Sequence, residues 1–194
     1  MRAARANRPG RRKPWPWVMT DPGDFAVSET LRNGLAVEVR ALRADDRERI
    51  AKAVRELERE SIYTRLFSYR NELTETGLDR IMHFDPDSEV VLVVTIGSGT
   101  DEIVIGSGRY IVGPGEQGAR RAEVAFMVEE DYHGLGIAGR LLRHLAGIAR
   151  ERGIASVEAA VLPENKARLA VFARSGLPMR RRNEGGEVHV MLTL

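Results

Sequence analysis

Alternating apolar and polar residues mark the strands that this chain is expected to form. The run LAVEVRALR, residues 35–43, alternates regularly and predicts the first strand. Beyond Pro86, β-branched residues become frequent and glycine-containing turns separate the apolar runs, which is typical of strands. Later strands are expected at 89–97, 103–112, 121–129, 157–162, 178–182 and 188–193.

Between these strands, apolar residues recur with the period of a helix. Asp45 and Asp46 are expected to begin the first helix, because acidic side chains favour the positive end of a helix dipole. A long helix is expected to follow the stretch HGLGIAG, to reach about Arg150 and to stop at Gly153. Other helical segments are expected at 61–70, 74–83 and 163–176.

This order of elements predicts a single α/β domain over residues 35–194. Its central sheet should be mixed and mostly antiparallel, with helices on its flanks. Residues 1–34 contain Pro-Trp-Pro-Trp and several turn formers, so we expect a basic, flexible leader there. The chain of 194 residues is long enough for one domain with a sizeable core, and it shows no internal repeat.

The composition excludes several kinds of site. The chain has no cysteine, which rules out disulfides, thiolate metal sites and a cysteine nucleophile, and which fits a cytoplasmic protein. Its four histidines are scattered without metal-ligand spacing, so no metal site is expected. No apolar run approaches about 18 residues, so no membrane-spanning segment is expected.

Positive charge is concentrated at the N-terminus. The first 13 residues carry six basic side chains and no acidic one. Such a tail can bind nucleic acid. Without those six, 24 basic residues stand against 28 acidic ones, and this negative balance disfavours nucleic-acid binding as the function of the domain.

The most informative stretch is VEEDYHGLGIAGRLLRHL, residues 128–145, where a strand should pass through a glycine-rich turn into a helix. Such a junction directs unpaired backbone N–H groups and the positive end of the helix dipole at one place. Gly134, Gly136 and Gly139 would let an anion approach the backbone closely, which favours a pyrophosphate cradle. The glycines also match G-x-G-x-x-G, but they follow three strands expected to be antiparallel, unlike a dinucleotide-binding unit.

At this stretch the sequence resembles the GNAT superfamily of N-acetyltransferases. That family carries [Gln/Arg]-x-x-Gly-x-[Gly/Ala] at the junction, and His133, Gly136 and Ala138 occupy the three defined positions, with His in place of Gln or Arg. Downstream, ENKARLAVFARSGL, residues 164–177, is similar to the family's asparagine-containing helix motif. The resemblance covers residues 35–194 and implies the GNAT fold and the use of acetyl-CoA.

The resemblance also implies roles for particular residues. Glu123 matches a catalytic glutamate and is expected to act as the general base toward the attacking amine. Because it lies between two apolar residues, we expect its carboxylate to be partly buried. The Val128 N–H is expected to stabilise the oxyanion of the thioester, and acetyl-CoA should lie between this strand and the strand at 157–162. Cofactor contacts are expected from Val128, His133, Gly134, Leu135, Gly136, Ile137, Ala138, Gly139, Asn165 and Phe172.

Within the superfamily, the chain is similar to the catalytic domain of bacterial Pat-type protein-lysine acetyltransferases. The similarity lies in VEVRALRADD, ESIYTRLFS and AEVAFMV, and it implies a protein lysine as acetyl acceptor. A small-molecule amine as acceptor and a non-catalytic acyl-CoA sensor are the alternatives, and retention of Glu123 favours an enzyme. Phe172 stands where relatives often have a tyrosine that protonates the leaving thiolate, and the sequence does not rank Tyr110 against Tyr132 as its replacement.

Overall fold

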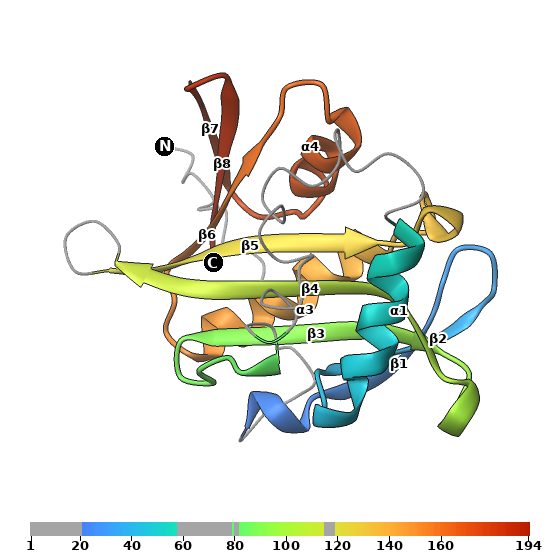
Figure 1. Ribbon diagram of the computed structural model, residues 1–194. Coiled ribbons are helices and arrows are strands. Elements are labelled where there is room, and N and C mark those ends of the chain that lie inside the picture. The colour runs from blue at the N-terminus through green and yellow to red at the C-terminus, as the bar shows by residue number, and fades with distance from the viewer. Residues whose placement is uncertain (1–20, 58–78, 80–81, 115–118) are drawn as a thin grey trace, which may run out of the picture.

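The computed structural model describes residues 21–57, 79, 82–114 and 119–194, and its main element is an eight-stranded sheet (Figure 1). The strand order is β1-β2-β3-β4-β5-β6-β8-β7. The strands are β1 (Ala26–Thr30), β2 (Ala36–Ala41), β3 (Glu89–Ile96), β4 (Ile103–Pro114), β5 (Arg120–Val128), β6 (Ser156–Val161), β7 (Met179–Glu184) and β8 (Glu187–Thr193). The described α-helices are α1 (Arg47–Leu57), α3 (Ile137–Glu151) and α4 (Lys166–Ala173).

Neighbouring strands are antiparallel except for β5 and β6, which run parallel and are joined through α3. This confirms the expected mixed, mostly antiparallel sheet. Helix α1 covers one face of the sheet and α3 covers the other (Figure 1). Strand β3 is buried at six consecutive positions because both of its faces are covered. In the part of the chain that is described, no helix is long and apolar enough to cross a membrane.

Two glycines of β4 allow α3 to lie close to the sheet. A Cβ atom on Gly108 would lie 2.9 Å from the Phe126 ring and 3.3 Å from Leu141 Cβ. A Cβ on Gly106 would lie 3.0 Å from Ile137. Since real Cβ contacts are not this short, glycine at these positions lets the first turns of α3 pack directly beside β4 and β5.

Strand β1 corrects the expected domain boundary, because the sheet begins before residue 35. It pairs with β2 from Ala26–Arg40 to Thr30–Ala36, and the flanking Phe25 and Leu31 are buried in the core. The expected flexible leader is therefore wrong for residues 26–30. The sequence pattern missed this strand because its residues AVSET include only one large apolar side chain.

The other strands lie within two residues of their expected bounds. The last helix is shorter than the expected 163–176, because Asn165 caps it and it begins at Lys166. The expected segment 61–70 lies outside the described residues. Of the expected segment 74–83, only residues 79, 82 and 83 are described.

A buried ion pair ties β2 to the start of α1. Nη1 and Nη2 of Arg40 each donate to a carboxylate oxygen of Asp46 at 2.7 Å, and both residues are fully buried. Arg40 Nη2 also donates to Glu102 Oε1 at 2.9 Å, and the Arg43 N–H donates to Asp46 at 2.8 Å. Burial alone would raise the pKa of Asp46, but its hydrogen bonds to Arg40 and Arg43 lower the pKa below its ordinary value.

Asp46→Ala is expected to lower the free energy of unfolding by about 3–5 kcal/mol, because it leaves the buried Arg40 guanidinium without its main partner. The exposed neighbour Asp45, which pairs with Arg49 at 3.3 Å, provides a matched control. Asp45→Ala should cost no more than about 1 kcal/mol. Urea denaturation followed by circular dichroism measures both values, and equal losses in the two variants would contradict this description of the ion pair.

Candidate active site

The parallel strands β5 and β6 separate partway along their length. They are paired only at Arg121–Ser156, Ala122–Val157 and Glu123–Glu158. Beyond Glu123, strand β5 continues to Val128 with no described strand paired to it on that side, while β6 continues to Val161. A wedge-shaped gap therefore opens within the sheet, directly after Glu123.

Backbone groups of β5 face this gap. The Glu129 N–H donates to the Ile105 carbonyl of the β4 segment at 3.0 Å. Because N–H groups alternate in direction along an antiparallel ladder, those of Phe126 and Val128 face away from β4 and toward the gap. The Val128 carbonyl faces the same way and lies 2.9 Å from Nε2 of His133, whose ring N–H donates to it. Backbone N–H groups of β5 therefore line the gap, where a bound molecule can accept hydrogen bonds from them.

The glycine-rich turn lies at the wide end of the gap. Gly134 and Gly136 have φ angles of 76° and 90°, a conformation that glycine adopts without strain. Gly136 is the N-cap of α3, and its carbonyl accepts the Arg140 N–H at 3.2 Å. The first N–H groups of α3 and its positive dipole end therefore point out of the turn, as an anion site requires.

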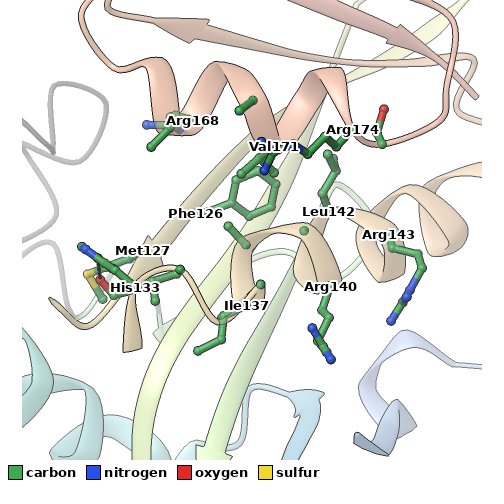
Figure 2. Close-up of a pocket in the computed structure, with 18 of the residues that line it drawn as sticks. Phe126, Met127, His133, Ile137, Arg140, Leu142, Arg143, Arg168, Val171 and Arg174 are labelled. Carbon is green, nitrogen blue, oxygen red and sulfur yellow. Dashed lines mark hydrogen bonds between the residues drawn. The ribbon is translucent and has the colours of Figure 1, made fainter. Parts of the chain in front are cut away.

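A large cavity of about 1460 Å³ joins the gap and the turn. It lies between α3 and α4, with the Phe126 side chain of β5 between the two helices (Figure 2). Ile137, Leu142 and Val171 add apolar wall. Six arginines also line the cavity: Arg32, Arg140, Arg143, Arg150, Arg168 and Arg174. An elongated ligand with an apolar arm and several anionic groups matches this surface.

Most of the expected cofactor residues line this one cavity. They are Val128, His133, Gly134, Gly136, Ile137, Ala138, Gly139 and Asn165. Asn165 also has a structural role, since its side chain accepts the Arg168 N–H at 3.0 Å and caps α4. Leu135 and Phe172 do not line the cavity: Leu135 packs on the core, and Phe172 is 1% exposed and packs against Phe126. The expected direct contacts of these two side chains with the cofactor are therefore not supported.

The expected burial of Glu123 is wrong, because the residue is exposed. Glu123 alternates with Ala122 and Val124, which point into the core, so its carboxylate lies on the other face of the sheet. Beside it in β6 lies Glu158, which pairs with Arg121 at 3.3 Å. Glu123 thus begins the gap as a solvent-accessible carboxylate, outside the wall of the main cavity.

The sequence does not rank Tyr110 against Tyr132 as the proton donor to the leaving thiolate, but the structure distinguishes them. Tyr110 is fully buried beneath α3, and Arg152 Nη1 lies 3.5 Å from its hydroxyl. Tyr132 lines the cavity. Burial, together with the nearby Glu129 and Asp131, raises the pKa of Tyr132, so its hydroxyl keeps its proton at neutral pH. Of these two tyrosines, Tyr132 is the one that a cavity ligand can contact.

The cavity arginines are the functional candidates that sequence reasoning missed. Arg32 belongs to the turn between β1 and β2, within the segment where the sequence predicts a flexible leader, and Arg140 lies in α3, where its position in the sequence predicts only a helix. Arg32 reaches the glycine-rich turn across 102 residues of sequence, where its Nη1 donates to the Gly134 carbonyl at 3.3 Å. No local sequence pattern predicts a contact between residues that lie so far apart in the chain.

A split pair of parallel strands, a helix N-terminus and a cavity lined by six arginines fit the class of acyl-CoA-dependent acyltransferases. Comparison with known proteins agrees with this class. The acetyltransferase (GNAT) family matches residues 51–177, and an acetyltransferase of Pseudomonas aeruginosa is 32% identical over 75% of this chain and 76% of its own length. The chain therefore belongs to the acetyltransferase (GNAT) family.

Solved structures show the same fold. The GNAT domain of S. lividans PAT is 34% identical, covers 87% of this chain and 97% of its own, and superimposes with a TM-score of 0.75. A cAMP-binding acyltransferase from Mycobacterium smegmatis is 26% identical with a TM-score of 0.57, and the match covers 87% of this chain but 47% of that protein. The chain is thus an acetyl-CoA-dependent N-acetyltransferase.

Proposed function

We propose that this enzyme transfers the acetyl group of acetyl-CoA to a lysine side chain of a protein. The observation that carries the proposal is the separation of β5 from β6 directly after Glu123, which puts a carboxylate at the narrow end of an acyl-CoA gap. Similarity to the GNAT domain of S. lividans PAT, at 34% identity over nearly the whole of that domain, supports a protein acceptor.

Glu123 is proposed as the general base. A lysine amine has a pKa of about 10.4, so at neutral pH it is almost entirely protonated and cannot attack a thioester. Glu123 is exposed, which lets an amine from a second molecule reach it directly or through one water. The carboxylate accepts a proton from the ammonium group, and the nitrogen lone pair then attacks the acetyl carbon.

The oxyanion formed by this attack needs a backbone donor near Glu123. Phe126 lies about 10 Å from Glu123 along an extended strand, against about 16 Å for Val128. Both N–H groups face the gap. We assign the oxyanion to the Phe126 N–H, in place of the Val128 N–H favoured by the sequence, and leave Val128 to bind the amide-containing pantetheine arm.

Collapse of the tetrahedral adduct completes the transfer. The new C–N bond remains, the C–S bond breaks, and sulfur takes the bonding pair of electrons. The second nitrogen proton is released as the amide forms, and the thiolate takes up a proton from Tyr132 or from solvent. The pyrophosphate of the leaving coenzyme A stays at the N-terminus of α3, in the cradle formed by residues 133–139.

Labelled acetyl-CoA added to a host-cell lysate tests the acceptor class. With the wild-type enzyme, we expect label in protein as acetyl-lysine, and with Glu123→Gln as the matched control, we expect little label. Label that enters small amines would leave the enzyme an acetyltransferase but overturn the protein acceptor. Tight acetyl-CoA binding without transfer to any lysate component would point to an acyl-CoA sensor.

A further inference from the structure

We propose that Arg32, on the turn between β1 and β2, binds the pyrophosphate of coenzyme A at the start of α3. This inference rests on the proposed function, because it takes acetyl-CoA as the cavity's ligand. Arg32 lies outside residues 51–177, the region that matches the family, so it is no part of the family's glycine motif. The residue is exposed and lines the cavity.

The Arg32 guanidinium lies directly over the glycine-rich turn. Its Nη1 donates to the Gly134 carbonyl at 3.3 Å, and a Cβ atom on Gly136 would lie 3.6 Å from its Nε. The single bond to Gly134 is long for an N–H···O contact and is exposed to solvent, so a phosphate oxygen can compete for the same donor. The other guanidinium N–H groups are available to the same anion.

The turn that carries Arg32 is anchored at both ends. The Leu31 N–H donates to the Leu35 carbonyl at 2.8 Å, and the Gly34 N–H donates to the Leu31 carbonyl at 3.0 Å. Asn33 Oδ1 accepts the Leu35 N–H at 3.1 Å, and Leu31 is buried in the core. The backbone at Arg32 is therefore held in place, and only side-chain freedom is lost when the guanidinium binds an anion.

A second guanidinium is fixed beside the first. Nη1 of Arg140 would lie 2.9 Å from a Cβ atom on Gly136. Its Nε lies 2.7 Å from Glu29 Oε2, and its Nη2 donates to the Thr30 carbonyl, so β1 holds this side chain in place. In Figure 2, Arg140 leaves α3 on the side away from α4. The cradle is therefore flanked by one fixed arginine and one adjustable arginine.

Arg140 and Arg143, beside the cradle, share the carboxylate of Glu29. Glu29 also binds Arg143 at 2.5 Å and His144 at 2.9 Å. Although burial opposes its ionisation, the His144 hydrogen bond and the nearby arginines lower the pKa of Glu29, so it is one full negative charge shared among several donors. Arg32 has no acidic partner among the described residues. A pyrophosphate, with a negative charge on each phosphate, would supply an anionic partner for Arg32.

The test compares the dissociation constants of coenzyme A and of dephospho-coenzyme A, which keeps the pyrophosphate but lacks the 3′-phosphate. Arg32→Gln is expected to weaken both ligands by the same factor, roughly 10- to 100-fold, the range for a lost charge-assisted hydrogen bond. Arg32→Lys, which keeps the charge without the planar fork, should recover part of the loss. Arg181→Gln, at an exposed arginine of β7, is the matched control and should change neither constant.

The outcomes of this test distinguish a pyrophosphate contact of Arg32 from a contact with the 3′-phosphate and from no contact. Equal weakening of both ligands, confined to the Arg32 variants, supports the pyrophosphate contact. Weakening of coenzyme A alone would assign Arg32 to the 3′-phosphate, and unchanged constants or an equal loss in Arg181→Gln would also overturn the proposal. Failure of the wild-type protein to bind either ligand would overturn the proposed function itself, which separates the two failures.

Discussion

Replacing Gly136 with glutamate is expected to abolish coenzyme A binding while leaving the sheet folded. The new side chain would begin 2.9 Å from Arg140 Nη1 and 3.6 Å from Arg32 Nε, so its carboxylate would pair with the cations that face the ligand. It would also repel the pyrophosphate from the α3 N-terminus. Losing two charge-assisted hydrogen bonds at about 1.5–3 kcal/mol each weakens binding by at least about 100-fold.

Backbone strain is the competing explanation, because φ is 90° at Gly136. Gly185, in the turn between β7 and β8, has a φ of 60° and open space around its Cβ position, so Gly185→Glu imposes comparable strain away from the cavity. Titration calorimetry should show near wild-type affinity for Gly185→Glu and no binding for Gly136→Glu. Unchanged affinity in Gly136→Glu would show that the pyrophosphate does not bind at this turn.

Glu123→Gln is expected to reduce turnover by roughly 10²–10⁴-fold, the usual effect of losing a general base. Acetyl-CoA affinity and stability should stay near wild type, because Glu123 is exposed and lies outside the wall of the cavity. The measurement is steady-state kinetics with an accepted lysine substrate, together with calorimetry for acetyl-CoA.

The pH dependence distinguishes proton removal from other roles. Free amine becomes tenfold more abundant with each pH unit below the lysine pKa of about 10.4, so the Gln variant should gain activity as pH rises. The wild-type enzyme should gain less, and the deficit of the variant should shrink. A pH-independent deficit would point to positioning, and loss of acetyl-CoA affinity would place Glu123 in the cofactor site.

Glu158 offers a matched control for this variant. It lies opposite Glu123 in the last paired position of β5 and β6, and Arg121 holds it in an ion pair. Glu158→Gln should therefore leave the pH profile of turnover unchanged. If Glu158→Gln shows the pH-rescued loss and Glu123→Gln does not, the base lies on β6 instead of β5.

The strand-turn-helix junction at the glycines could be predicted from sequence because its geometry is local. The glycines at 134 and 136, the strand before them and the helix after them occupy one continuous stretch, and the structure joins them as expected. The downstream Asn165 motif was equally local, and it caps α4 beside the same cavity. These features are formed by residues that are close in the sequence, so the local residue pattern predicts them.

The features that sequence missed depend on contacts between distant segments. Strand β1 has weak apolar character and is recognisable mainly through its pairing with β2. Arg32 becomes a candidate only once that pairing carries it to Gly134. Ala122 and Val124 point into the core, so Glu123 lies on the other face of the sheet, and the sequence does not show whether that face is covered at Glu123.

Acetyl-CoA is expected to lie in the gap between β5 and β6 with its pyrophosphate at the start of α3. A crystal structure of the protein with acetyl-CoA tests this placement. We expect pyrophosphate oxygens within hydrogen-bond distance of the N–H groups at residues 136–139, and the thioester carbonyl at the Phe126 N–H. A pyrophosphate bound away from α3, or an acetyl group outside the gap, would contradict it.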